Sequence, residues 1–235
     1  MWKLGKFWLI FLALAALLLV LAVACEEEEE EEEEVPGITD TEIILGMHGP
    51  LSGTWGAAYA PVIGGVEAYF RYVNAEEDGA CGRDIILKIE DDQYLPSKAV
   101  EAIKKLLDRD KVFATIAGIG TAAHSAVWED LNERGVPDLW IMSGAHKFGS
   151  EPEKYPWSVP LLPNYYIEGT IFGKYISENM PGKKVGLLRQ NDDWGEDVQN
   201  GLENGLDPDK NEFVSVQSYE LTDISIRSQV TNLKS

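Results

Sequence analysis

Short apolar runs alternate with helix-like patterns along most of this chain, and that alternation is the feature that most limits the possible folds. Nearly continuous apolar runs occupy residues 43–47, 85–89, 112–117 and 139–142. Runs of this length are typical of strands that are buried on both faces of a parallel sheet. Between them, apolar residues recur every three or four positions, as in amphipathic helices. Repeated strand–helix–strand units predict an α/β fold, with doubly wound parallel sheets that carry helices on both faces.

Three helices are expected between these strands. Pro61 suits the first turn of the first helix, because a helix needs no backbone N–H group there. Residues 100–107 carry the apolar face of the second helix. Thr121 is suited to cap the third helix, which buries Ala123, Val127 and Leu131 and ends near Gly135 and Pro137.

A proline-rich stretch then interrupts the pattern. Residues 149–163 contain four prolines, so no helix is expected to run through them, and the stretch predicts a crossing between two lobes. After it, Ile167, Ile171, Tyr175 and Ile176 predict a helical face, and residues 185–188 and 213–216 predict two strands. Asp193 and Glu196 have the spacing of a helix capping box, and another helix is expected from residue 224.

We therefore expect a first lobe over residues 41–160 and a partial second lobe over residues 161–235. The second lobe has only two good strands, and its last helix runs directly into residue 235. This favours a chain that is truncated inside its second lobe. The alternative is a small lobe that packs on the first, although an open sheet with uncovered edges is a liability.

The first 24 residues have the pattern of an export signal. Lys3 and Lys6 precede an uncharged apolar run that ends in Ala22-Val23-Ala24, with small residues at the two positions that a signal peptidase reads, and Cys25 follows at once. This arrangement resembles a bacterial lipoprotein leader, with Cys25 as the lipidated residue. An uncleaved membrane anchor and plain secretion are the alternatives.

Nine consecutive glutamates, Glu26 to Glu34, follow Cys25. Their mutual repulsion favours an extended tether over residues 25–40, and a cation-binding tail is the alternative. The whole chain has 40 acidic and 20 basic side chains, a net charge of −20. Such a balance repels polyanions and argues against nucleic-acid binding through phosphate contacts.

The loops that follow the predicted strands carry the candidate binding residues, because open parallel sheets bind ligands beyond the carboxyl ends of their strands. Gly118, Gly120 and Thr121 lead into a helix start, where backbone N–H groups attract a carboxylate or phosphate. Ser143, Gly144 and Ala145 add a hydroxyl group and an open backbone. Flat apolar surfaces come from Trp55, Tyr59, Tyr165, Tyr166 and Trp194. Together these groups suit a small molecule with a carboxylate and an apolar part.

Sharper motifs do not fit. Gly118 to Ala123 matches a dinucleotide-binding fingerprint, but it follows the third strand instead of the first. His48, His124 and His146 lie near strand ends without a carboxylate spaced for a metal site. Asp91 and Asp92 are suited to cap turns, with cation or ammonium binding as the alternative. Cys81 is expected to be a free thiol. No cofactor is expected, and no nucleophile or base suggests catalysis.

Six motifs in order resemble one family. They are Ile44-Leu45-Gly46 with Pro50-Leu51-Ser52-Gly53, Gly64-Gly65-Val66-Glu67, Asp91-Asp92, Gly118-Ile119-Gly120-Thr121, Ser143-Gly144-Ala145, and Asn191-Asp192-Asp193-Trp194-Gly195. Their order and spacing over residues 41–235 resemble the leucine/isoleucine/valine-type solute-binding proteins of bacterial ABC importers. That family has the type I periplasmic-binding fold, in which two Rossmann-like lobes close on the ligand.

The resemblance implies roles for individual residues. Thr121 and Ala122 match positions that hold an amino-acid carboxylate, and Ser143 and Ala145 lie in the loop that holds carboxylate and ammonium. Trp194 takes the place of an aromatic residue that closes over the ligand. Trp55 and Tyr59 lie near the first-lobe aromatic residue, with the spacing off by at least one position. The ammonium-binding acid of the family has no match here.

The resemblance implies a membrane-tethered binding protein outside the cytoplasm. It would capture a branched-chain or related amino acid, or a small amide, and deliver it to an ABC permease. A sensor module of the same fold is one alternative, and an enzyme of the doubly wound class is another.

Overall fold

The computed structural model describes residues 35–234. The predicted signal peptide, Cys25 and the glutamate run lie outside these residues. The strands are β1 (Glu42–Gly49), β2 (Asp84–Asp91), β3 (Ala114–Ile116), β4 (Asp138–Ile141), β5 (Ser158–Pro160), β6 (Lys184–Gln190) and β7 (Glu212–Tyr219). The helices are α2 (Gly53–Glu76), α3 (Pro96–Lys104), the π-helix η1 (Lys105–Arg109), α4 (Thr121–Ser125), α5 (Trp128–Glu133), α6 (Lys147–Ser150), α7 (Tyr165–Asn179), α8 (Asp193–Gly205) and α9 (Arg227–Lys234).

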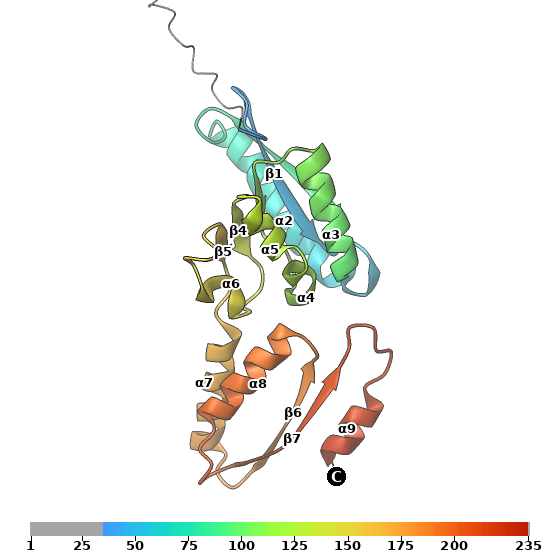
Figure 1. Cartoon of the computed structure of the whole chain (residues 1–235), viewed down its shortest axis with the longest axis vertical. Coiled ribbons are helices and arrows are strands. Elements are labelled where there is room, and N and C mark those ends of the chain that lie inside the picture. Colours follow the sequence, from blue (N-terminus) through green and yellow to red (C-terminus); the bar gives the residue numbers. More distant parts are fainter. Residues whose placement is uncertain (1–34, 235) are drawn as a thin grey trace, which may run out of the picture. The chain divides into compact units, whose positions relative to one another are not determined.

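These elements form two parallel sheets, one of five strands in the order β2-β1-β3-β4-β5 and one of β6 and β7 (Figure 1). Every strand pair is parallel. The chain passes from β1 to β2 on one side and then crosses back to β3 on the other side of β1. The direction in which the chain adds strands to the first sheet therefore reverses between β1 and β3. The predicted α/β fold with parallel sheets is confirmed.

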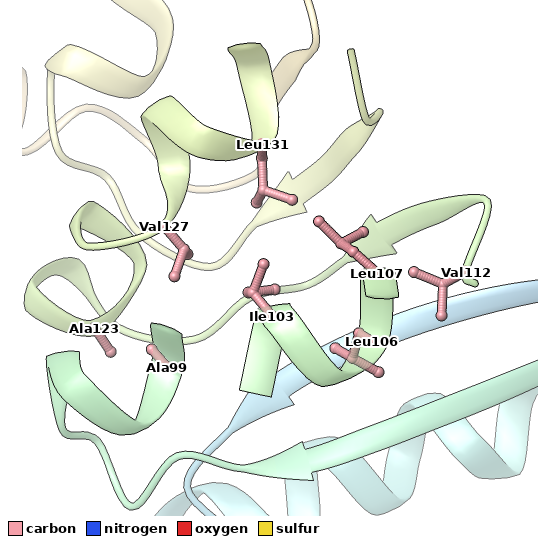
Figure 2. Close-up of a cluster of buried hydrophobic side chains, with 8 residues drawn as sticks. All are labelled: Ala99, Ile103, Leu106, Leu107, Val112, Ala123, Val127 and Leu131. Atoms are coloured by element: carbon pink, nitrogen blue, oxygen red, sulfur yellow. The ribbon is translucent and has the colours of Figure 1, made fainter. Parts of the chain in front are cut away.

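Helices cover both faces of the first sheet, as the continuous apolar runs predict. In β1, Leu45 and Met47 pack with Ile63 and Phe70 of α2 on one face. Ile44, which points the other way because side chains alternate along a strand, packs against the opposite cluster. Figure 2 shows that cluster, which is formed by Ala99, Ile103, Leu106, Leu107, Val112, Ala123, Val127 and Leu131.

Two details of this opposite face differ from a regular helix pair. The chain continues from α3 into the π-helix η1, and both Leu106 and Leu107 are buried. The helix expected from Thr121 is divided into α4 and α5, with Ala126 and Val127 between them. The predicted buried residues Ala123, Val127 and Leu131 are nevertheless all buried.

Three predicted helix starts are wrong. Helix α2 begins at Gly53, so Pro61 lies inside it instead of in its first turn, on the exposed side. The N-cap of α4 is Gly120, and Thr121 is already helical. The N-cap of α8 is Asp192, whose side chain accepts a hydrogen bond from the Gly195 backbone, and Asp193 follows it inside the helix.

The proline-rich stretch also holds more structure than expected. It contains the end of the short helix α6, and its Ser158–Pro160 segment forms β5, the edge strand beside β4. Pro160 is tolerated there because an edge strand has one side free of ladder hydrogen bonds.

Helices α7 and α8 pack through small residues, not through the apolar face that the sequence predicts for α7. Ile167, Ile171 and Tyr175 are exposed in the described part of the chain. The buried residues of α7 include Gly169 and Gly173. Their partners on α8 are again glycines, because a Cβ atom added at Gly201 would lie 2.1 Å from the Tyr166 carbonyl oxygen. Helices approach this closely only where side chains are absent.

We predict that Gly201→Ala destabilises the protein by about 1–3 kcal/mol, because the new methyl group forces α7 and α8 apart. Gly65→Ala is the matched control, since a Cβ atom there meets nothing within 4 Å. In a helix interior the control change stabilises by about 0.5–1 kcal/mol. Urea unfolding measures both values, and equal effects of the two substitutions would contradict the close packing of α7 on α8.

Candidate functional site

The loops after the strands of the first sheet converge where the strand order reverses, between β1 and β3. β1 and β3 are neighbours, yet the chain leaves them toward helices on opposite faces of the sheet. Such a switch point leaves a crevice beyond the carboxyl ends of the strands, which is the usual ligand position in open α/β sheets. The predicted loops of the first sheet, Gly118–His124 and Ser143–His146 among them, lie at this edge.

Thr121 and Ser143, predicted to bind ligand, contact each other. The Thr121 Oγ1 and Ser143 Oγ atoms are 2.7 Å apart, and both side chains are buried. The Ala145 backbone N–H group donates to Ser143 Oγ over 3.2 Å. The pair therefore ties the start of α4 to the loop after β4. The Thr121 hydroxyl is engaged inside the protein, and the groups left for a carboxylate are the first backbone N–H groups of α4, Ala122 included.

Tyr94 is the central aromatic residue of this edge, and it was not among the aromatic residues predicted from the sequence to contact a ligand. Its ring stacks on Tyr59 at 5.9 Å between centroids and lies 5.6 Å from the ring of Trp55. The ring also covers the Gly120 backbone, where an added Cβ atom would lie 2.3 Å from it. Burial, together with the neighbouring Tyr59 and Asp192, raises the pKa of the Tyr94 hydroxyl, which therefore stays neutral. The Tyr94 backbone is left-handed, with φ of 64°. Strained backbone of this kind clusters at functional sites, and only the structure reveals it here.

Tyr165 and Trp194 provide aromatic rings from the second half of the chain. Their centroids are 6.1 Å apart, and the Tyr165 ring lies against Gly144. Tyr165 also acts on Tyr59, whose pKa is raised first by burial and then by Tyr165. We define the aromatic cluster as Trp55, Tyr59, Tyr94, Tyr165 and Trp194. Four of its five members are residues that the sequence predicted.

Besides burial, the charge of Asp192 raises the pKa of Tyr94 in this cluster and of Tyr219 near it. Burial raises the pKa of Asp192 above its ordinary range, by more than the hydrogen bonds from Gly195 and Gln190 lower it. A half-buried carboxylate beside aromatic rings is suited to meet a positive charge.

Helix α8 is tied to the loops of the first sheet by polar contacts. Asp193 pairs with Lys147 at 2.8 Å and accepts from the Ser125 hydroxyl at 3.2 Å. The His146 backbone N–H group donates to Asp197 over 2.7 Å. Burial also raises the pKa of Asp197, against the effect of that hydrogen bond. These contacts hold the start of α8, with Trp194, beside the predicted binding loops.

The histidines and Asp91–Asp92 have structural partners. Asp91 accepts from the backbone of Leu51, Ser52 and Gln93, as a turn cap does. Asp92 caps Tyr94 and also bonds to His48. Within residues 35–234, no group of histidine, cysteine and acidic side chains is arranged to hold a metal ion. Cys81 is free and exposed.

The chain belongs to the periplasmic binding protein family, whose sequence profile matches residues 42–235. This membership agrees with the predicted family and implies a location outside the cytoplasm. A comparison with curated protein sequences gave no significant match. No helix within residues 35–234 is long and apolar enough to cross a membrane.

Solved structures with the same fold bind different ligands. The branched-chain amino acid transporter substrate binding protein LivJ from Streptococcus pneumoniae, in complex with isoleucine, has a TM-score of 0.70 and 19% identity over 83% of this chain and 54% of its own. A fatty acid ABC transporter substrate-binding protein from Thermomonospora curvata has a TM-score of 0.71 and 24% identity over 85% of this chain and 50% of its own. An ABC transporter solute binding protein from R. palustris, in complex with benzoate, has a TM-score of 0.69 and 20% identity over 81% and 52%.

These likenesses establish the type I periplasmic-binding fold. The chain spans about half the length of the structures it matches. At these identities the ligand does not follow from the fold.

We predict that Asp192→Asn changes how stability depends on pH. The folded protein holds the Asp192 proton more tightly than the unfolded chain does, because its pKa is raised. The wild type therefore loses stability as the pH rises from about 3.9, the ordinary aspartate value, to the raised value. Asparagine caps a helix as well as aspartate does and does not titrate. Urea unfolding between pH 3.5 and 7.5 is expected to show that the free energy of unfolding of the variant rises relative to that of the wild type through that window.

Asp209→Asn, at an exposed aspartate in the turn after α8, is the control and should follow the wild type. If Asp192→Asn also followed the wild type at every pH, the raised pKa of Asp192 would be refuted.

Proposed function

We propose that this protein is the extracytoplasmic solute-binding component of an ABC importer and that it holds a small apolar amino acid at the aromatic cluster. The observation that carries the proposal is the meeting of three kinds of group at one sheet edge. These are the first N–H groups of α4, the aromatic cluster, and the half-buried Asp192 carboxylate. Family membership supports binding and delivery to a permease, and catalysis has no part in it.

Each group has one role in this proposal. The backbone at the start of α4, with Ala122 and the Gly144–Ala145 loop, binds the carboxylate through N–H groups. The Thr121–Ser143 hydroxyl pair positions these two loops relative to each other. The aromatic rings enclose the apolar side chain, and Asp192 with the ring faces receives the ammonium group. Asp192 thereby takes the role of the ammonium-binding acid that the sequence comparison lacked.

The ligand sits between side chains from both halves of the chain. Tyr94, Trp55 and Tyr59 come from the first sheet and its helix α2, whereas Tyr165 and Trp194 come from α7 and α8. Division into a lobe of residues 41–160 and a second lobe from residue 161 is part of this proposal. Closure of such lobes around a ligand would be a hinge motion.

The N-terminal segment supports delivery at the membrane surface. Residues 1–24 act as an export signal, Cys25 carries the lipid, and the glutamate run serves as spacer. Mass spectrometry of the exported protein tests this part, since a chain that still begins at Met1 without an acyl group would refute it.

We predict that Trp194→Ala weakens ligand binding about ten- to a hundredfold, which corresponds to about 1.4–2.7 kcal/mol of lost apolar contact. Isothermal titration calorimetry with isoleucine, phenylalanine and benzoate measures the effect. Trp157→Ala is the matched control, because Trp157 is exposed to a similar degree at the start of β5, away from the carboxyl ends of the strands. Equal affinities of the two variants for every ligand would remove Trp194 from the site.

A second prediction separates amino acids from simple carboxylates. Asp192→Asn is expected to weaken isoleucine or phenylalanine binding at least tenfold, because it removes the partner of the ammonium group. It should leave benzoate binding unchanged, since benzoate has no positive charge. Benzoate binding by the wild type without any amino-acid binding would instead identify an aromatic acid as the ligand.

A further inference from the structure

Four buried side chains below the candidate site form one continuous hydrogen-bonded chain. They are Asp92, His48, His124 and Asp138, and we name them the buried relay. Asp92 Oδ2 lies 2.7 Å from His48 Nδ1, His48 Nε2 lies 2.9 Å from His124 Nδ1, and His124 Nε2 lies 2.8 Å from Asp138 Oδ2. All four side chains are fully buried. None of them belongs to the proposed ligand walls.

The central link between the two histidines fixes how many protons the buried relay holds. The two imidazole planes differ by only 5° and the centroids are 5.2 Å apart, so the rings meet edge to edge. If each histidine were neutral and donated to its own aspartate, two nitrogen lone pairs would face each other across 2.9 Å. One more proton is needed to fill that link. The three hydrogen bonds therefore contain three protons, and with two carboxylates the net charge is −1 wherever the protons lie.

The surroundings of the buried relay leave this charge uncompensated by other ions. Asp138 Oδ1 accepts from the Thr115 hydroxyl, and Asp92 Oδ1 accepts from the Tyr94 backbone N–H group. The edge of the Phe148 ring faces His124. Glu90, which pairs with His48 in the sheet register, bonds to Lys105, and Asp91 bonds to Ser52. Lys147 of α6 pairs with Asp193, and Tyr94 is neutral.

The pKa of Asp138 reflects the charge and hydrogen bonds of the buried relay. Burial alone would raise the pKa of Asp138, but the charge and hydrogen bond of His124, the Thr115 hydroxyl and the charge of His48 outweigh it, so the pKa lies below its ordinary value. This direction agrees with a positive charge shared by the two imidazoles.

The buried relay also contacts the loops of the candidate site. Asp92 holds the Tyr94 backbone, which has the left-handed φ of 64°. The Gly118 backbone passes very close to the hydrogen bond between His48 and His124. A Cβ atom at Gly118 would lie 2.5 Å from His124 Nδ1 and 2.7 Å from His48 Nε2. The loop that leads to Thr121 therefore rests on the two histidines.

We propose that the buried relay takes up one proton when the first sheet folds and that it positions the Tyr94 and Gly118 loops only in this three-proton state. An unfolded chain above about pH 7 carries two protons on the two imidazoles, since free histidine titrates near 6.5. Well above pH 7, folding therefore binds one proton there, and the rise of the equilibrium constant for unfolding approaches tenfold per pH unit. Below about pH 6 the unfolded imidazoles carry four protons, so the sign reverses. The stability contributed by the buried relay is greatest near pH 6.5.

Asp138→Asn tests the proton count without changing the shape of the side chain. The asparagine Oδ1 atom still accepts from Thr115, and its amide donates to His124 Nε2. His124 then donates to His48 and His48 to Asp92, so two neutral imidazoles fill the chain. The variant needs no third proton and is expected to lose the rise of the unfolding equilibrium constant between pH 7 and 8, which is about sixfold for the wild type.

The measurement is urea unfolding of the whole chain at pH 7 and pH 8. Asp84→Asn, at an exposed aspartate at the start of β2, is the control and should keep the wild-type slope. The double variant Asp92→Asn with Asp138→Asn places donors at both ends, so two ring N–H groups would face each other between His48 and His124. Its loss in the free energy of unfolding is therefore expected to exceed the sum of the losses of the two single variants. Equal pH slopes for the wild type and Asp138→Asn would overturn the proposal.

A direct count decides the matter even if a variant does not fold. Nuclear magnetic resonance of the wild type, labelled with ¹⁵N in histidine, is expected to show three N–H groups on the rings of His48 and His124 at pH 7.5. A His146→Gln background removes the third histidine from the spectrum. Only two protons in all, counted over the two rings and the carboxyl groups of Asp92 and Asp138, would refute the proposal.

Discussion

The parallel arrangement of the first sheet is the constraint on which the rest of the structure depends. Because every strand points the same way, all the loops that follow the strands lie at one edge. The order β2-β1-β3 opens that edge between β1 and β3, where the connections diverge to opposite faces. Tyr94, Thr121 and Ser143 are thus brought together from loops that lie far apart in sequence. The Thr121–Ser143 hydroxyl pair lies at this edge, and the buried relay runs from Asp92 at this edge to Asp138 at the start of β4.

Polar contacts at this edge are satisfied inside the protein before any ligand arrives. Thr121 bonds to Ser143, Asp91 caps the turn after β1, and the buried relay satisfies two histidines and two aspartates. Buried polar groups are costly unless they are paired, so these networks fix the loops in one arrangement. A preorganised edge leaves backbone N–H groups and aromatic faces for the ligand, which lowers the ordering cost of binding.

Packing elsewhere follows a different rule. Helices α7 and α8 meet through glycines, which permit a close backbone approach but bury little apolar side-chain area. The larger side chains of α7, such as Ile167 and Ile171, lie on its exposed side. The first sheet, by contrast, is held by two large apolar clusters, one on each face. The polar contacts of Asp193 and Asp197 are therefore important in fixing the start of α8.

The sequence alone determined the strands other than β5, the α/β fold with parallel sheets, the family and most of the aromatic cluster, because hydrophobic periodicity and motif order are local signals. It did not determine the start of α2 at Gly53, the N-cap of α8 at Asp192 or the glycine-lined contact of α7 with α8, which depend on neighbours in space. The buried relay was also missed, since its histidines find carboxylates 44 and 14 residues away. Only tertiary structure decides such pairings, because strand order, not sequence spacing, determines which side chains meet.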